Sequence, residues 1–137
     1  MEEDFRGGFG KFRAGGQGSK HYLSAKGKSG VALIENTSTL SSNVMSLDSG
    51  ESRIRVDFTA YALMFEDDDE FCLDSSSGGS NYSEEVCWSL NDIENNDWTN
   101  FSWELDAPST GVSIRFRCAG NHNHDDVLID DVRVRAQ

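Results

Sequence analysis

The stretch Val127-Leu128-Ile129-Asp130-Asp131-Val132-Arg133-Val134 decides the fold class, because it is the most strand-like run in the sequence. Aliphatic residues dominate it, and after the acidic pair they recur with the period of two that a half-buried strand requires. We therefore predict a central β-strand over these residues. Two carboxylates inside such a run need a specific explanation.

The phase of this strand predicts where Asp130 points. If Val132 and Val134 face the core, a period of two places Leu128 and Asp130 on the same inward side. A buried carboxylate is costly unless it is protonated, hydrogen-bonded, paired with a base or bound to a cation. A purely structural carboxylate and a cation ligand are both open interpretations of Asp130.

Length and composition bound the architecture. The chain of 137 residues suits one domain spanning residues 1–137. Short apolar runs are separated by Ser, Asn, Asp and Gly, there is a single Pro, and no run has a long helical period. The sequence therefore predicts an all-β fold with polar turns.

Charge excludes some classes of partner. The chain has 12 basic and 24 acidic residues, a net charge of −12, which opposes binding to nucleic acid and to anionic membranes. No apolar run approaches transmembrane length, so we expect no membrane insertion. The start Met1-Glu2-Glu3-Asp4 has no feature of a signal peptide. We expect the sequence to be a domain of a longer or processed protein.

The cysteines indicate an oxidising compartment. The segment from Cys72 to Cys87 is typical of a hairpin that turns around Gly78-Gly79. Symmetric closure would place Cys72 opposite Cys87, close enough for a disulfide, and such a bond predicts a secreted or extracellular protein. Cys118 shares the phase of the preceding apolar residues and is predicted to be a buried free thiol.

Two further segments alternate as strands with one wet face. Residues 52–64 place Ile54, Val56 and Phe58 on one side and Arg55, Asp57 and Thr59 on the other, and residues 114–118 place Arg115 and Arg117 on the wet side. Residues 43–47 are predicted to form another strand. The acidic run 66–70 is predicted to be a solvated loop; a dedicated metal site is the alternative, although the run does not fit an EF-hand.

The loop 120–126 contains His122 and His124 beside carboxylates. Two histidines at this spacing could bind a transition metal, but the loop supplies no second pair of ligands in sequence. An exposed polar turn is the favoured interpretation.

Several of these segments together resemble secreted MAM-like and carbohydrate-binding jelly-roll domains. The resemblance covers nearly the whole chain and depends on short motifs: the Asp4-Phe5 opening with its glycine-rich continuation, the strand ending Asp57-Phe58-Thr59-Ala60-Tyr61, and the closing Ile129-Asp130-Asp131-Val132. It implies a jelly-roll β-sandwich of two antiparallel sheets with neighbouring termini.

The same resemblance implies a structural Ca²⁺ ion near the first and last strands. In such domains the Asp of the closing Ile-Asp motif is a calcium ligand, which corresponds to Asp130 here. Carboxylates near the opening strand, Glu3 or Asp4, would supply further oxygens, with backbone carbonyls from residues 28–30. Calcium requires about six to eight oxygen ligands.

Ligand binding in the resembling domains uses the wet face of one sheet or the loops at one end. The residues predicted to contact a ligand on such a face are Arg55, Asp57, Tyr61, Arg115 and Arg117. The alternative is a cross-strand ladder of opposite charges that stabilises the sheet without binding anything. If the ligand were an acidic polysaccharide, Arg115 and Arg117 would be its anchors.

The function that the resemblance implies is non-catalytic binding of a polysaccharide or glycoprotein glycan. The alternative is a MAM-like adhesion module that binds a protein partner. Catalysis is not expected, because the sequence has neither a nucleophile turn with its His and Asp partners nor a His-Glu-x-x-His motif.

Overall fold

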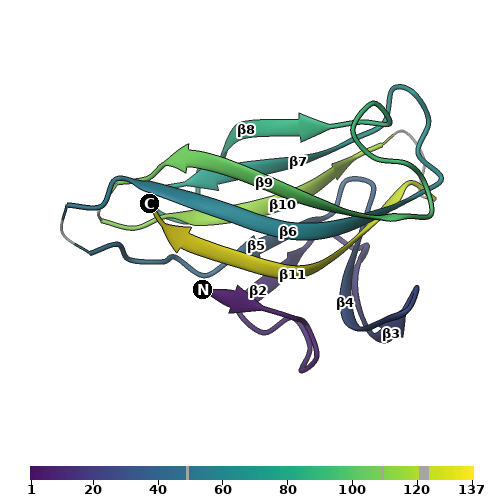
Figure 1. Ribbon diagram of the computed structural model, residues 1–137, viewed down its shortest axis with the longest axis horizontal. Coiled ribbons are helices and arrows are strands. Elements are labelled where there is room, and N and C mark those ends of the chain that lie inside the picture. The colour runs from purple at the N-terminus through teal and green to yellow at the C-terminus, as the bar shows by residue number, and fades with distance from the viewer. Residues whose placement is uncertain (49, 109, 121–123) are drawn as a thin grey trace.

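The computed structural model describes residues 1–48, 50–108, 110–120 and 124–137. Strands in this part of the chain form two antiparallel sheets packed face to face, and Figure 1 shows the two layers. The predicted jelly-roll β-sandwich is confirmed. His122, one of the two histidines considered as metal ligands, lies outside the described residues. The described residues include no helix long and apolar enough to cross a membrane.

The strands follow one another along the chain with these bounds: β1 Glu2–Glu3, β2 Phe12–Gly15, β3 Ser19–Ala25, β4 Lys28–Glu35, β5 Thr39–Ser42, β6 Arg53–Leu63, β7 Glu70–Ser76, β8 Ser83–Trp88, β9 Trp98–Asp106, β10 Ser113–Ala119 and β11 Asp126–Ala136. The first sheet, here called the β11 sheet, has the order β3-β4-β11-β6-β9, with β1 also paired to β11. The second, the β10 sheet, has the order β2-β5-β10-β7-β8.

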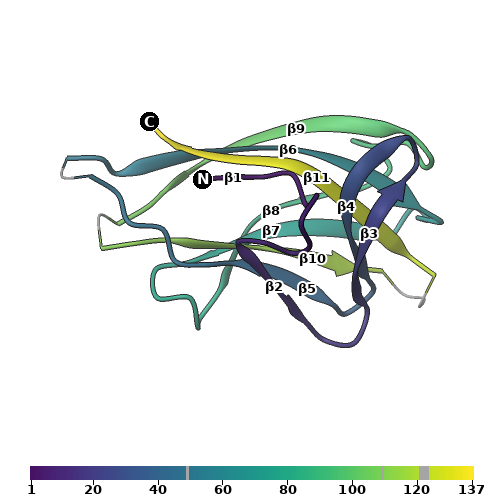
Figure 2. The same cartoon turned by 90° about the horizontal axis from the view of Figure 1, so that it is seen from below.

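The predicted central strand β11 is central. One edge of it pairs with β6 over most of its length, while the other pairs with β4 from Asp126 to Ile129 and with β1 at Val132 and Arg133. Figure 2 shows β1 lying along β11, with β3 and β4 crossing it steeply. The N-terminal segment therefore replaces β4 as the neighbour of β11 close to the acidic pair.

The core is an aromatic and aliphatic layer between the sheets. Phe58 on β6 contacts rings from both sheets, with centroid distances of 5.3 Å to Phe101, 5.4 Å to Trp88 and 4.8 Å to Phe116. These rings are positioned by strict alternation, since Val56 and Ala60 flank Phe58 on the same side of β6 and are fully buried. Large rings bury the most apolar area per residue, so this cluster fixes the packing of the two sheets.

A bulge in β11 makes the predicted phase wrong. The partners of Asp130 and Arg133 on β6 are Thr59 and Asp57, so three steps along β11 match two along β6. Asp131, inside the bulge, has φ of +50°. The extra residue reverses which positions of β11 point toward the core on the two sides of the bulge. After the bulge, Val132 and Val134 face the core. Before the bulge, Val127 and Ile129 face the core, whereas Leu128 and Asp130 face the outside of the sheet.

Asp130 is nevertheless buried, with 4% exposure, because the β3–β4 hairpin folds over the outer face of the β11 sheet. Leu128 packs there with Val31, Leu33 and Tyr61 in a second apolar cluster. The tip of the hairpin is bound to β9 by Trp98, whose Nε1 donates a hydrogen bond to the Lys26 carbonyl at 2.9 Å. Asp130 is therefore buried, as the sequence predicted, but it is covered on the outer face of the sheet and does not lie in the main core.

The cysteine prediction is confirmed. Cys72 on β7 lies opposite Cys87 on β8, and the two form a disulfide with a Cα–Cα distance of 4.1 Å. Cys118 is a buried free thiol, and burial is the first cause that raises its pKa to about 12. A thiol with this pKa is not a nucleophile at neutral pH.

Two other predictions are wrong in part. Residues 43–47 do not form a strand; the strand lies earlier, at β5, and Met45 makes only an isolated bridge to Val112. The acidic run 66–70 is not wholly solvated, because Asp69 is 1% exposed and accepts a hydrogen bond from the Glu66 backbone N–H. A side chain that organises its own turn replaces water as the partner of the backbone.

Candidate functional site

The first candidate site is a hollow of about 270 Å³ where β1, β4 and β11 meet. We call it the Asp130 hollow, and its lining residues are Asp4, Arg6, Gly27, Lys28, Ser29, Asp130 and Asp131. The structure thus brings Asp4 and Asp130 to the same hollow, the placement that the resemblance implied for Glu3 or Asp4. Asp131 joins them because the bulge turns its side chain outward, where it is about half exposed.

The local backbone explains why the N-terminal segment reaches this hollow. Gly30 on β4 has φ of +78°, and a Cβ there would lie 2.6 Å from the backbone of Arg6. The nearby carbonyl of Phe5 is hydrogen-bonded to the ring of His21 on β3. Only glycine allows so close an approach of the two segments.

The electrostatics of Asp130 are those of an incompletely compensated carboxylate. Burial is the main cause that raises the pKa of Asp130 to about 6, with the charges of Asp131 and Asp4 acting in the same direction. The backbone N–H of Asp131 and, to a smaller extent, the charge of Lys28 lower this pKa. Lys28 Nζ lies 3.7 Å from Asp130 Oδ2 and 3.0 Å from Asp131 Oδ2. Asp130 Oδ1 is buried and has no hydrogen-bond partner among the residues that the structure describes.

These residues fit a hard divalent cation. Carboxylate and backbone oxygens are the ligands that Ca²⁺ prefers, and a buried carboxylate oxygen without a partner is the feature that a bound cation would satisfy. Asp130, Asp4 and Asp131 offer such oxygens at one place. The partial neutralisation by Lys28 is the feature that fits a cation least well.

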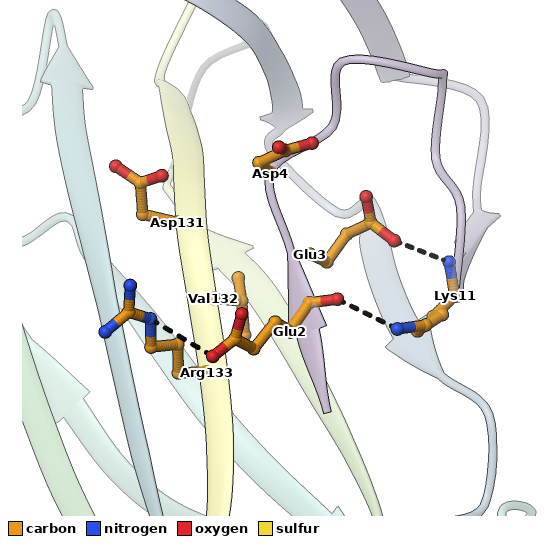
Figure 3. Close-up of a pocket in the computed structure, with 7 residues that line it drawn as sticks. All are labelled: Glu2, Glu3, Asp4, Lys11, Asp131, Val132 and Arg133. Carbon is orange, nitrogen blue, oxygen red and sulfur yellow. Dashed lines mark hydrogen bonds and ion pairs between the residues drawn. The ribbon is translucent and has the colours of Figure 1, made fainter.

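Glu3 lies differently from Asp4. Its Oε1 accepts a hydrogen bond from Phe5 N and its Oε2 accepts one from Lys11 N, both at 3.0 Å. Figure 3 shows Glu3 turned toward Lys11, on the side of β1 away from Asp131. Glu3 lines a neighbouring hollow of about 520 Å³ rather than the Asp130 hollow. Its carboxylate organises the loop between β1 and β2.

The second candidate site is a groove of about 540 Å³ on the outer face of the β11 sheet. We call it the Arg55 groove, and the polar residues that line it are Arg55, Asp57, Thr59, Asn100, Ser102, Asp131 and Arg133. The cross-strand pairs Asp57 with Ser102 and Thr59 with Asn100 place these side chains in rows across β6 and β9. The groove offers both charged and neutral hydrogen-bonding groups.

The arginines of the groove are compensated by carboxylates but remain accessible. Arg55 Nε lies 3.1 Å from Asp57 Oδ1, and Arg133 Nε lies 3.6 Å from Glu2 Oε1. The side chain of Arg55 is 46% exposed and that of Arg133 is 53% exposed. Such exposed ion pairs contribute little to stability, which leaves these groups available for a ligand.

Tyr61 shares the face of the groove but is not among its lining residues. It is 8% exposed, its ring packs against Trp98 at a centroid distance of 5.3 Å, and Lys26 Nζ lies 5.9 Å from the ring centroid. The ring therefore stabilises the hairpin that closes one end of this face.

Arg115 and Arg117 lie on the outer face of the other sheet. They were predicted to share one wet face with Arg55 and Asp57, and this is wrong, because β6 and β10 belong to different sheets. Both arginines bind Asp74 on β7, with Arg115 Nη2 at 2.8 Å and Arg117 Nε at 3.0 Å from its Oδ2. These contacts form a cross-strand ladder of opposite charges, and ligand binding by the two arginines stays a prediction.

Asp74 and Tyr82 are the residues of this face that sequence reasoning missed. Asp74 is 1% exposed, and the Tyr82 ring covers Arg115 with the guanidinium carbon 4.3 Å from the ring centroid. Tyr82 also shares a hydrogen bond with Ser113 at 2.8 Å. The signal for Asp74 was available, because it follows Cys72 by two residues and so shares its outward phase on β7.

The sequence matches no protein-family model, and no curated protein matches it. Solved structures do share its fold. TmCBM61 in complex with β-1,4-galactotriose is 17% identical, with a TM-score of 0.72 over 98% of this chain and 95% of that one. The CBM22-1–GH10 modules of Clostridium thermocellum xylanase 10B, complexed with xylohexaose, are 17% identical with a TM-score of 0.68, covering 100% of this chain and 28% of that one.

An adhesin domain is similar as well. The K1 cleaved adhesin domain of Lys-gingipain from Porphyromonas gingivalis is 13% identical, with a TM-score of 0.72 over 100% of this chain and 98% of that one. These structural neighbours include carbohydrate-binding jelly-roll modules, and the similarity extends over nearly the whole of this chain.

Proposed function

We propose that this protein is a non-catalytic carbohydrate-binding module of a secreted or cell-surface protein, stabilised by calcium, which binds a neutral glycan in the Arg55 groove. The observation that carries the proposal is the fold shared with polysaccharide-binding modules over nearly the whole chain. The Cys72–Cys87 disulfide supports an oxidising compartment and hence secretion.

The composition of the groove supports a glycan ligand. Sugar hydroxyls donate and accept hydrogen bonds, and the groove presents guanidinium, carboxylate, hydroxyl and amide groups side by side. Each good hydrogen bond to a charged group adds affinity and fixes orientation. Asn100 and Ser102 extend the row of polar groups across β9.

Charge favours a neutral glycan over an acidic one. Arg55 is paired with Asp57, and Arg133 with Glu2, so the groove has no uncompensated cluster of arginines. Arg115 and Arg117 on the other face are neutralised by Asp74 and also by Glu84, which lies 2.9 Å from Arg117 Nη2. A net charge of −12 repels polyanions at long range.

The binding test is an array of soluble galactan, xylan, β-glucan and polyuronates, followed by titration calorimetry on the polymers that bind. Arg55→Ala should weaken binding of a neutral polymer by about tenfold, the loss of one charged hydrogen-bonding group. Arg53→Ala is the matched control, because Arg53 is on the same strand and pairs with Glu104 and Asp106 outside the groove.

The paired substitution Arg115→Ala/Arg117→Ala tests the other face. Loss of binding in this variant, with Arg55→Ala unchanged, would move the site to the β10 sheet. Absence of binding to every polymer would refute the glycan function.

The adhesin neighbour supports a second candidate function, an adhesion module that binds a protein partner. The MAM-like comparison belongs to this candidate. Both functions are non-catalytic, and they are separated by the glycan array in calcium and in chelator. Binding to protein partners with no glycan bound would favour adhesion.

Calcium is proposed as a structural ion with Asp130, Asp4 and Asp131 among its ligands, and Glu3 holding the adjacent loop. Because a ligand that binds only the folded protein raises its stability, the melting temperature should be higher in calcium than in chelator. The Asp130→Asn variant should lose this difference. Equal melting of the unsubstituted protein in both conditions would refute the calcium site.

A further inference from the structure

Lys28 occupies a fixed position at the mouth of the Asp130 hollow. It follows the hairpin turn at Lys26 and Gly27, whose φ values of +51° and +84° are both left-handed. These values are those of a two-residue hairpin turn with the preferred twist. The hydrogen bond from Trp98 to the Lys26 carbonyl anchors the turn, and Lys28 Nζ lies 5.1 Å from the Trp98 ring centroid.

The ammonium group lies where a cation would interact with the acidic pair. Its Nζ is 3.0 Å from Asp131 Oδ2 and 3.7 Å from Asp130 Oδ2, and the Lys28 side chain is only 27% exposed. The other oxygen of Asp130, Oδ1, has no hydrogen-bond partner in the described part of the chain. One positive charge therefore compensates two carboxylates, one of which is almost completely buried.

A divalent ion and this ammonium group cannot both bind the two carboxylates without repulsion. Calcium coordinates carboxylate oxygens at about 2.3 to 2.6 Å. At that distance from Asp130 and Asp131 it would lie within a few ångströms of Nζ, where like charges repel strongly in a partly buried site. Either the lysine side chain withdraws or the ion binds less tightly.

We infer that Lys28 is an internal competitor for the divalent cation: it neutralises Asp130 and Asp131 when no ion is bound and lowers the affinity of the hollow for calcium. This inference depends on the cation site proposed above. It also predicts that ion binding releases Lys28 from the face of Trp98, while the hydrogen bond to the Lys26 carbonyl keeps the turn in place.

The test is calcium titration by calorimetry at low ionic strength on the intact protein and three variants. Lys28→Met should bind calcium about two- to fivefold more tightly, the range expected when a partly exposed ion pair is removed. Lys28→Arg retains the charge and should bind as the unsubstituted protein does. Lys26→Met is the matched control, because Lys26 is in the same turn but makes no ion pair with the acidic residues of the hollow.

Stability in chelator gives an independent readout. Without calcium, Lys28→Met should melt at a lower temperature than Lys26→Met, because it leaves Asp130 and Asp131 uncompensated. In saturating calcium this difference should disappear or reverse.

The outcomes separate the inference from the site itself. Calcium binding that is equal or weaker in Lys28→Met than in the unsubstituted protein overturns the inference and leaves the site standing. Absence of calcium binding in every variant refutes the site and the inference together. Binding in Lys28→Met alone supports competition that is complete in the unsubstituted protein.

Discussion

Arg117 donates hydrogen bonds to both carboxylate oxygens of Asp74, from Nε at 3.0 Å and from Nη2 at 3.1 Å, on the outer face of the β10 sheet. This side-chain contact is the first cause that raises the pKa of Arg117. Arg115 binds the same carboxylate, so a nearly buried negative charge is held between two partly buried positive ones. The pairing contributes to fold stability as well as to the charge balance of this face.

Asp74→Ala should therefore be strongly destabilising. Removing one partner of a buried ion pair leaves the other charges without compensation and costs about 3 to 5 kcal/mol. Asp57→Ala, which breaks a more exposed pair with Arg55, should cost less than about 1 kcal/mol. Urea denaturation of both variants measures the difference, and similar losses would show that the Asp74 network adds nothing beyond a surface pair.

The disulfide should stabilise the hairpin mainly through the unfolded chain. Cys72 and Cys87 are separated by 15 residues, and a loop of this size is worth about 3 kcal/mol in the chain-entropy account. Cys72→Ala/Cys87→Ala should lower the free energy of unfolding by about that amount. The measurement is urea denaturation, with the unsubstituted protein in reductant as a second comparison. Unchanged stability in both would contradict the expected effect.

Asp126 should make the stability depend on pH. Burial, followed by the charge of Glu35 opposite it on β4, raises the pKa of Asp126 to about 6, against the opposing effects of His124 and Lys20. The folded protein holds this proton more tightly than the unfolded chain. The contribution to stability is therefore present below about pH 4 and is lost as the pH rises through about 6.

Asp126→Asn removes this ionisation. It should raise the free energy of unfolding at pH 7.5 by about 1 to 3 kcal/mol and change it little at pH 4. Urea denaturation of the variant and of the unsubstituted protein at pH 4 and at pH 7.5 measures this change in the free energy of unfolding. An effect of the same size at both values would mean that the change acts through packing and not through charge.

Gly30→Ala should detach the N-terminal segment. The new methyl group would meet the Arg6 backbone at 2.6 Å, and the positive φ is unfavourable for alanine. Strain and overpacking together cost about 2 to 4 kcal/mol. The calcium-dependent rise in melting temperature should shrink as well, because Asp4 is carried by that segment. Gly50→Ala is the comparison for strain alone, since Gly50 also has a positive φ, lies outside the Asp130 hollow, and a Cβ there meets no atom within 4 Å.

The alternation of β6 and β10 was sufficient to predict which side chains face outward, because a period of two is local information. It could not assign Arg55 and Arg115 to a common face, since sheet membership depends on pairing between strands distant in sequence. The hairpin with Cys72 and Cys87 was predictable because its closure is local and symmetric.

The bulge at Asp131 was the feature that sequence reasoning could not detect. Nothing in the residue types shows that three residues of β11 match two of β6 there. The burial of Asp130 was still predicted, but for the wrong reason, since the hairpin tip and not the core covers it. The resemblance placed residues 28–30 beside Asp130, and Lys28 and Ser29 do line the hollow. The contact of the Lys28 ammonium group with Asp130 was missed, because it depends on the direction in which the Lys28 side chain leaves β4.

Because the free thiol of Cys118 is buried, its reactivity reports local opening of the native structure. Cys118 is 2% exposed, and its thiol donates a hydrogen bond to the Asp125 carbonyl with a sulfur–oxygen distance of 3.3 Å. An alkylating reagent can reach the thiol only when the structure around it opens, so the rate of modification measures how often this region opens in native buffer. The alkylation rate of this single free thiol therefore measures local opening without an added label.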